Sequence, residues 1–510
     1  TRPVMVDGGN CLKDNSLPVN GVHYIETDWR YYPDEAYTLD RAYRSHEAAT
    51  IGHWGKTPWQ LVPDRPIYMG ESFCVNCNQP SSLAQFGGAG AFVGWGPAAY
   101  RGAGLLAKML FEGYRWHGVD TTYILGTTTN LAGLHHNSWK PVCVFCRQWN
   151  WTFGSGSEVG RTLKVFNDTH DDDPIEAGWE LVLDGKKVAG ERRTFRLEPG
   201  QHKEYEITMP VPEVGQRTDG QFILTCRRGG EEVFREVKDI AVLDPDAGPK
   251  PDLPGTTLAV LDPDGGVIAR LKARGIPFTG VDSVEDIPDT AVVVVVGKDA
   301  IDSRTSTDPR WLSLAGQGKV ILVLEQENSL HYQAVPADFG VTDFAGRIAF
   351  MEDELHPIFK GLEQSDFFTW SGNHVVYKNV YSKASAGARS LAHCDEKLGY
   401  SAIAACPVNE GLMLLCQMVV GEKLDSDPVA ARLFDNMLAY AATYRPIHRD
   451  TAVIIDPADE RMKLLEQSSL KFDPADDLLK TVRAGRHGIV VFDATPANLK
   501  ALADNRETVK

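Results

Sequence analysis

The sequence lacks any hydrophobic run long enough to cross a bilayer. A membrane-spanning helix needs about 20 apolar residues, whereas the charge-poor stretch from Ala291 to Gly297 has the length of a buried strand. Basic residues are also few, since 52 Lys and Arg stand against 69 Asp and Glu, for a formal net charge of −17. This negative surplus would repel a phosphate backbone. The composition therefore argues against a membrane span and against a nucleic-acid partner.

Cysteine is scarce, with nine residues in 510, which is too few for a disulfide scaffold. Two pairs, Cys74 with Cys77 and Cys143 with Cys146, have the CxxC spacing of zinc sites. The second pair lies in an extended apolar stretch, where residues three apart point to opposite faces, so we expect buried thiols or one disulfide instead of zinc. The run His170–Asp173 has oxygen ligands for calcium, but a solvated turn is favoured. We expect no metal and no cofactor.

The first 150 residues carry four strand signals and one helix signal. Pro97 suits the first turn of that helix, its apolar residues fall on one face, and Gly118 can end it. The alternation of strand and helix predicts parallel strands. Four strands are too few for a barrel of eight, which takes about 250 residues. The strand signals begin at Val4, Val22, Pro66 and Thr122.

Downstream, two further patterns follow one another. Residues 157–245 are short alternating strands separated by Gly, Pro and Asp turns, which predicts an immunoglobulin-like β-sandwich. The proline-rich segment Pro245–Gly255 is typical of a semi-rigid linker. Residues 256–445 return to α/β alternation, which predicts one doubly wound domain. Its expected strands are Thr257–Asp262, a strand near Phe278, Ala291–Gly297, Lys319–Glu325 and Glu410–Val420, and its expected helices lie near Gly265–Arg274 and Pro428–Tyr444.

The doubly wound domain lacks the motifs of a nucleotide site or a nucleophile. The turn LDPDGG has no GxGxxG order, and the strand ending at Glu325 runs into EQENSLH, without a cysteine elbow. Asp262 and Glu325 at strand ends would repel phosphate. Cys406 and Cys416 are expected to pack. We therefore expect an architectural module that contacts the rest of the chain or a neighbouring subunit, and that binds neither nucleotide nor metal.

The final segment repeats the beginning of that domain. Leu261-Asp262-Pro263 recurs as Ile455-Asp456-Pro457, and Val293–Val295 recurs as Ile489–Val491. Residues 446–510 are therefore expected to be the start of a second α/β copy. We expect the chain to be incomplete at both ends.

In its order of domains the chain resembles the C-terminal part of a multidomain glycoside hydrolase of the β-galactosidase-like superfamily, akin to family 2. The motifs TRPVMVDGG, VHYIE and PIYMGES resemble the fifth, sixth and seventh strands of its TIM (β/α)8 barrel, and WKPVCVFCRQWNWTFGSGSEVGRTLKVFND resembles the exit into the sandwich. EGLMLLCQMVV with PVAARLFDNMLAYAATY resembles its amidotransferase-like, flavodoxin-like domain. The resemblance implies that residues 1–156 are the C-terminal half of the barrel, and that the N-terminal half, with the Asn-Glu acid/base, comes from other sequence. The strand at Val4–Asp7 would pair with that polypeptide.

The same resemblance implies a nucleophile. Retaining glycosidases need two carboxyl groups about 5 to 5.5 Å apart, and Glu71, at the end of PIYMGE, stands where the family places its nucleophilic glutamate. The rival is Glu26, at the end of VHYIE. His23 and Tyr24 can donate hydrogen bonds to the nucleophile or to a sugar hydroxyl, although His23 fits a buried structural histidine equally well.

Asp7 and three tryptophans complete the expected substrate site. A pyranose ring stacks on an indole and its hydroxyls need acceptors, so Asp7, Trp29, Trp95 and Trp151 suit a sugar as a set. A single tryptophan more often packs in a core.

These observations favour a retaining glycoside hydrolase that acts on a β-linked galactoside or a related polysaccharide. The alternative is a non-catalytic carbohydrate-binding or structural protein on the same scaffold. A CxxC metalloprotein is a more distant third. A homo-oligomer is compatible with either of the first two. The residues do not determine the cellular compartment, although a secreted or periplasmic location is somewhat favoured.

Overall fold

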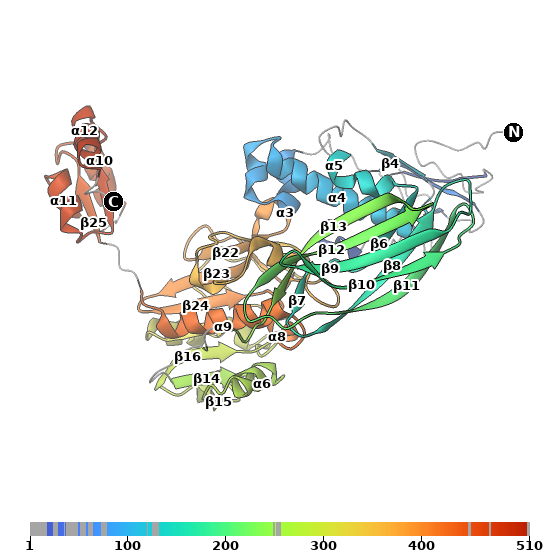
Figure 1. The fold of residues 1–510 in the computed structure, drawn as a ribbon. Helices are drawn as coiled ribbons and strands as arrows, with labels where there is room; N and C mark the ends of the chain where they lie inside the picture. Colours follow the sequence, from blue (N-terminus) through green and yellow to red (C-terminus); the bar gives the residue numbers. More distant parts are fainter. Residues whose placement is uncertain are drawn as a thin grey trace. The chain divides into compact units, whose positions relative to one another are not determined.

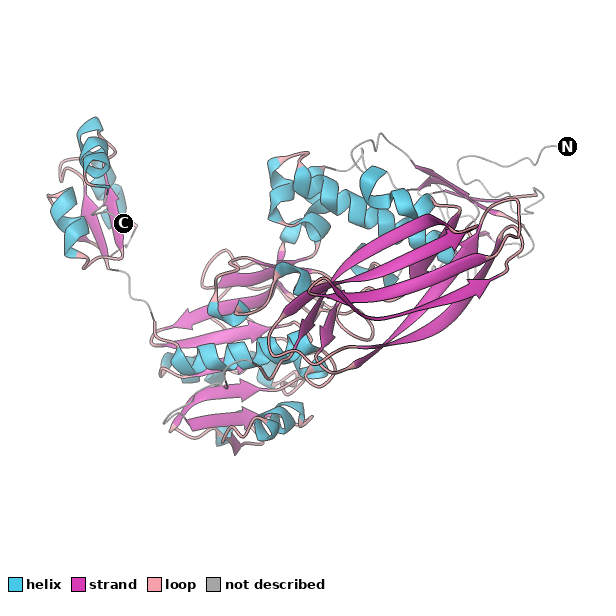
Figure 2. Cartoon of the chain, viewed as in Figure 1, coloured by secondary structure: helices cyan, strands magenta, loops and turns pink. Residues whose placement is uncertain are grey.

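The protein is a mixed α/β fold with extensive β-sheets (Figures 1 and 2). It divides into two compact units, Thr1–Tyr444 and Arg445–Lys510. The strand expected at Val4–Asp7, and with it Asp7, lies outside the described residues, as do Tyr24, Glu26, Cys74 and Cys77. The computed structural model describes residues 18–23, 29–34, 36, 49–50, 58–59, 65–72, 79–119, 121–124, 132–247, 250, 257–446, 450–468 and 471–506.

A parallel three-stranded sheet lies at the start of the first unit. Its strands β1 (Asn20–His23), β4 (Ile67–Ser72) and β5 (Thr121–Ile124) are hydrogen-bonded in the order β1-β4-β5. Both pairings are parallel, which confirms the pairing expected from the alternation of strand and helix. Two short strands, β2 (Ala49–Thr50) and β3 (Pro58–Trp59), pair separately.

The helix α4 (Pro97–Trp116) connects β4 to β5. It begins with proline in its first turn, where no intrahelical donor is lost, and buries the face that carries Leu106 and Leu110. Gly118 adopts a positive φ of 75° just after its end, a conformation that glycine tolerates without strain. Short helical turns that contact α4 are η3 (Pro80–Leu83), α3 (Ala84–Gly87), η4 (Ala89–Val93), α5 (Ala132–His135) and η5 (His136–Trp139). A further turn, η1 (Trp29–Tyr31), lies between β1 and β2 in the chain.

Residues 142–243 form two mainly antiparallel sheets. One sheet has the order β10-β9-β12-β13-β7 and the other the order β11-β8-β6. The strands are β6 (Val142–Cys146), β7 (Thr152–Gly154), β8 (Glu158–Asn167), β9 (Ile175–Leu183), β10 (Lys186–Phe195), β11 (Gln201–Pro210), β12 (Thr218–Arg228) and β13 (Glu231–Leu243).

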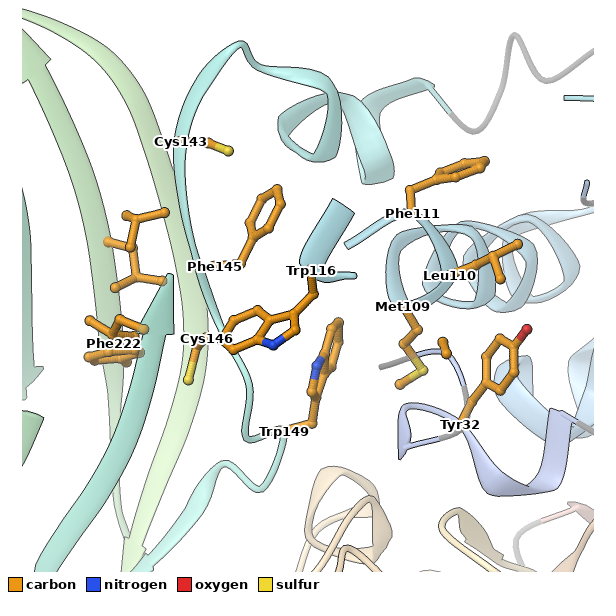
Figure 3. Close-up of a cluster of buried hydrophobic side chains, with 14 of the residues drawn as sticks. Tyr32, Met109, Leu110, Phe111, Trp116, Cys143, Phe145, Cys146, Trp149 and Phe222 are labelled. Carbon is orange, nitrogen blue, oxygen red and sulfur yellow. The ribbon is translucent and has the colours of Figure 1, made fainter. Parts of the chain in front are cut away.

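The strand β6 joins these sheets to the preceding segment. All five of its residues are buried, because it has a sheet on one side and α4 on the other. Trp116 of α4, Phe145 of β6, and Trp149 and Phe222 meet in one continuous hydrophobic core (Figure 3). We call this contact the α4–β6 seam. Burial of four aromatic side chains here makes the two parts of the chain mutually dependent for stability.

A nine-stranded sheet spans residues 257–416. Strands β15, β14, β16, β17 and β24 are parallel in that order, and β23, β22 and β19 extend the sheet antiparallel, with β21 also paired to β23. The strands are β14 (Thr257–Leu261), β15 (Thr279–Gly280), β16 (Ala291–Val296), β17 (Val320–Val323), β19 (Ala349–Met351), β21 (Tyr381–Ser382), β22 (Arg389–Cys394), β23 (Tyr400–Val408) and β24 (Gly411–Cys416). A separate small pair joins β18 (Ala345–Gly346) to β20 (Tyr377–Lys378).

Both faces of this sheet are covered. Alternate residues of β16 enter different cores: Val293 and Val295 pack with residues of α6 (Gly266–Ala273) and α9 (Pro428–Thr443), whereas Val294 and Val296 pack with residues of α7 (Arg310–Gly316). This alternation explains the unbroken valine run, since a strand buried on both faces needs apolar residues throughout. The remaining helices are α8 (Val420–Lys423) and the turns η6 (Val284–Asp286), η7 (Thr305–Thr307), η8 (Pro357–Phe359), η9 (Gln364–Phe367) and η10 (Glu396–Leu398).

The second unit contains a parallel sheet of order β26-β25-β27, the order that β15, β14 and β16 have in the first unit. The repeated sequence motif therefore corresponds to a repeated strand arrangement. Its elements are β25 (Thr451–Ile454), α10 (Glu460–Gln467), β26 (Asp473–Pro474), α11 (Leu478–Ala484), β27 (Ile489–Phe492) and α12 (Pro496–Asp504). In the part of the chain that the structure describes, no helix has both the length and the apolar character that a bilayer crossing requires.

The close packing around Gly411 in the large sheet predicts how substitutions there change the free energy of unfolding. A Cβ added at Gly411 in β24 would collide with the carbonyl oxygens of Ala315 and Lys319, whereas one added at Gly280 in β15 would meet nothing. Gly411→Ala should lower the free energy of unfolding by about 2 to 3 kcal/mol, and Gly280→Ala should change it by less than about 0.5 kcal/mol. Urea unfolding of both variants tests this, and equal midpoints would contradict it.

Candidate active site

Glu71 is the penultimate residue of β4, at the C-terminal end of a parallel sheet. In the β1–β4 pairing His23 lies opposite Gly70, the residue before Glu71. On the other side of β4, the register with β5 shifts between Met69 and Ser72. Such irregularities re-aim side chains at the rims of sheets, and C-terminal strand ends are where α/β folds place their ligands. The backbone therefore brings Glu71 and His23 to one sheet edge.

The three tryptophans lie in different surroundings. Trp29, in η1, is partly buried, with its ring centroid 6.4 Å from that of Phe86. Trp151 stacks on Phe222 at 5.9 Å inside the sandwich and lines a cleft of about 530 Å³, to which the α/β domain contributes Glu363 and Ser365. Trp95 is 41% exposed and follows η4, in the connection from β4 to α4. Of the three, Trp95 is the most exposed.

A cluster of hydrogen bonds that joins three parts of the first unit is centred on Asp34, a residue without a sequence motif. Its carboxylate accepts hydrogen bonds from Arg147 at 3.1 Å, from Arg347 at 2.9 Å and from Nδ1 of His374 at 2.9 Å. Nε2 of His374 in turn accepts from the backbone N–H of Trp149 at 3.0 Å. We call this cluster the Asp34 junction. It joins the segment after β1, the chain that leads into the sandwich, and the α/β domain.

The electrostatics of the Asp34 junction follow from burial and pairing. Burial alone would raise the pKa of Asp34, but the hydrogen bond from His374 and the positive charges of Arg347 and Arg147 outweigh burial and hold the pKa well below its usual range. Burial lowers the pKa of His374, against its bond to Asp34. A neutral His374 that donates from Nδ1 and accepts at Nε2 satisfies every partner.

Further contacts join the α/β domain to its neighbours. Arg30 lies 3.4 Å from Asp395, and Thr152 and Arg217 of the sandwich donate to Asp366 at 2.7 Å and 2.5 Å. These contacts confirm the expectation that the α/β domain packs against other parts of the chain.

Carboxylates accept hydrogen bonds from backbone N–H groups in the first turns of α6 and α8. Asp262 accepts from the backbone N–H of Ile268, and Glu325 accepts from those of Gly421 and Glu422. Burial raises the pKa of Glu325 to about 7, against its backbone hydrogen bonds. These backbone donors are therefore already occupied by acidic groups.

The cysteines of the second CxxC pair are buried in the core, and two of the aspartates of the acidic run form ion pairs with arginines. Cys143 and Cys146 are buried and not disulfide-bonded, and burial raises the pKa of Cys143 to about 12, which keeps it a thiol. Asp171 pairs with Arg228 and Asp172 with Arg196. Within the described ranges, no group of three or more His, Cys, Asp or Glu could hold a metal ion.

No protein family and no curated protein matches the chain. Among solved structures, the CARDB domain of a protein from Pyrococcus furiosus is 14% identical over 20% of this chain and 93% of that chain, with a TM-score of 0.16. A β-glucosidase from Listeria innocua is 11% identical over 20% of this chain and 16% of that one, with a TM-score of 0.16. A protein described as a β-galactosidase from Bacteroides fragilis is 10% identical over 37% and 39%, with a TM-score of 0.16.

Glycosidases are thus among the structural neighbours at low similarity, and this chain spans well under half of each. TM-scores of this size carry no argument about function, so any assignment has to be supported by the chain's own residues.

The Asp34 junction makes a testable prediction. Asp34→Asn removes the negative charge that faces two partly buried arginines, so the free energy of unfolding at pH 7 should fall by about 2 kcal/mol or more. Because the folded pKa of Asp34 is depressed, its contribution is complete above the unfolded value of about 3.9 and is lost on acidification below it. The difference between wild type and variant should therefore shrink between pH 5 and pH 2, as measured by urea unfolding.

The matched control is Asp353→Asn, which removes the solvent-exposed ion pair with Arg389 and should cost less than about 1 kcal/mol. Equal losses in the two variants, or a pH-independent difference for Asp34→Asn, would contradict the assignment.

Proposed function

We propose that the protein is a retaining glycoside hydrolase that acts on a β-linked galactoside or a related polysaccharide, with Glu71 as its nucleophile. The observation that supports this most is the backbone position of Glu71, at the C-terminal end of β4, where the register with β5 shifts and β1 places His23 alongside. A carboxylate on a rigid strand end can be held in the narrow geometry that attack on an anomeric carbon demands.

The chemistry assigns a role to each candidate residue. Glu71 attacks the anomeric carbon and forms a covalent glycosyl-enzyme, while a second carboxylic acid about 5 to 5.5 Å away protonates the leaving oxygen and then activates water. That acid/base belongs, in our proposal, to the N-terminal barrel half. His23 and Tyr24 orient the nucleophile or a sugar hydroxyl, and Asp7 and Glu26 accept hydrogen bonds from hydroxyls. The exposed Trp95 stacks on the apolar face of a sugar ring.

A fluorinated substrate can test Glu71 even if the acid/base is supplied by other sequence. In 2,4-dinitrophenyl 2-deoxy-2-fluoro-β-galactoside the leaving group departs without protonation, while fluorine at C2 destabilises the oxocarbenium-like transition state and slows hydrolysis of the intermediate. The natural protein that contains this chain should therefore become covalently labelled. Peptide mapping by mass spectrometry should place the label on Glu71.

The matched control is Glu26→Gln, which should keep the label on Glu71, whereas Glu71→Gln should abolish labelling and lower turnover by orders of magnitude. A label on any other carboxylate would overturn the assignment. Binding of a galactoside without labelling or turnover would favour the carbohydrate-binding protein instead.

A further inference from the structure

A groove of about 650 Å³ lies where the C-terminal end of α4 meets the sandwich. We call it the α4–β8 groove. The residues that lead from α4 into β5, Gly118 and Val119, also line it. Because α4 returns the chain from the C-terminal end of β4 to the N-terminal end of β5, the groove lies at the opposite end of the sheet from Glu71. Its chemically distinctive lining residues are Tyr114, Arg115, Trp139, Phe166, Asp168 and His202.

Trp139 is held rigidly and yet exposed. Its indole Nε1–H donates to Nδ1 of His135 at 3.1 Å, and its ring centroid is 4.7 Å from that of Phe111, which projects from the side of α4 opposite Met109 (Figure 3). The side chain of Trp139 nevertheless stays 41% exposed. A large apolar surface that is fixed in place but left open to solvent is a feature of ligand sites.

Polar groups surround this ring. Arg115 donates to the backbone oxygens of Ser138 and Lys140, and to the carboxylate of Asp168 at 2.7 Å. Asp168 is exposed, and its charge is compensated by Arg115. His202 is exposed beside Phe166, and a neutral imidazole can both donate and accept a hydrogen bond.

We propose that the α4–β8 groove is a second carbohydrate-binding site, which takes a neutral oligosaccharide with one pyranose ring stacked on Trp139 and its hydroxyls bonded to Asp168 and His202. A sugar presents an apolar face to an indole and, at its edges, hydroxyls that both donate and accept. A purely apolar ligand would remove water from Asp168 and His202 without replacing the hydrogen bonds that the water makes. An anion would be repelled by Asp168 and by the net charge of the chain, which is −17. The volume lies within the roughly 300 to 1,000 Å³ of small-molecule sites.

Oxidation of tryptophan by N-bromosuccinimide tests this on the unaltered protein. Trp139 and Trp95 are both 41% exposed, so both should react, and peptide mapping by mass spectrometry separates their rates. The probes are β-1,4-galactotetraose, whose choice rests on the proposed function, and cellotetraose, whose choice does not. At least one probe should slow oxidation of Trp139 about tenfold at saturation. Oxidation of Trp139 at the same rate with and without both sugars would overturn the proposal.

Two variants provide a second measurement. Trp139→Ala should weaken binding of the protecting sugar at this site about tenfold or more in calorimetric titration, and Asp168→Asn should weaken it less. The control is Tyr332→Ala, which removes an aromatic ring that is 69% exposed in the α/β domain and should leave the affinity unchanged. Unchanged affinity in a folded Trp139→Ala would also overturn the proposal. Neither measurement depends on hydrolysis, so failure here leaves Glu71 untouched, and failure to label Glu71 leaves this site untouched.

Discussion

The Asp34 junction is the constraint on which the first unit depends. The partners of Asp34 are 113, 313 and 340 residues away in sequence, so one carboxylate requires three parts of the chain to be in place together. Displacement of the segment that carries Asp34 would remove a carboxylate from two partly buried arginines, and such a loss is costly. The apolar α4–β6 seam adds a non-directional contribution (Figure 3). Together they account for the first unit being a single compact body despite its several sheets.

This constraint gives the α/β domain a role in the proposed site. The segment from Trp29 to Ala36 follows β1 closely, and it is held by Asp395 through Arg30 and by Arg347 and His374 through Asp34. The α/β domain therefore fixes the chain just beyond the strand end that carries His23. A rigid supporting shell of this kind is what a carboxylate site needs if its geometry is to be held within a fraction of an ångström.

Local patterns in the sequence predicted much of the fold. The valine run of β16 reflects burial on both faces of a sheet, and the prolines at the starts of α4 and α9 reflect a fixed φ at the first turn of a helix. The antiparallel strands β19, β22 and β23 were not predicted. They pair with one another in the order β23-β22-β19, so their stability depends on contacts between segments and not on a local pattern.

The candidate site was less predictable than the fold. Glu71 could be placed at a strand end from a local pattern, but Asp34 carries no motif, since its importance arises from partners hundreds of residues away. The same holds for Trp139, which is unremarkable in sequence and becomes a candidate ligand contact only because α4 and β8 leave a groove beside it. Trp151 was grouped with the other tryptophans by residue type, and its packing on Phe222 depends on the sandwich core.

The central claim is that Glu71 attacks the sugar directly, and the stereochemistry of hydrolysis tests it. Proton NMR of the natural protein acting on an aryl β-galactoside, recorded before mutarotation, shows which anomer is released first. Double displacement through Glu71 predicts β-galactose as the first product, because two inversions restore the configuration. Release of α-galactose first, which requires direct attack by water, would contradict the account.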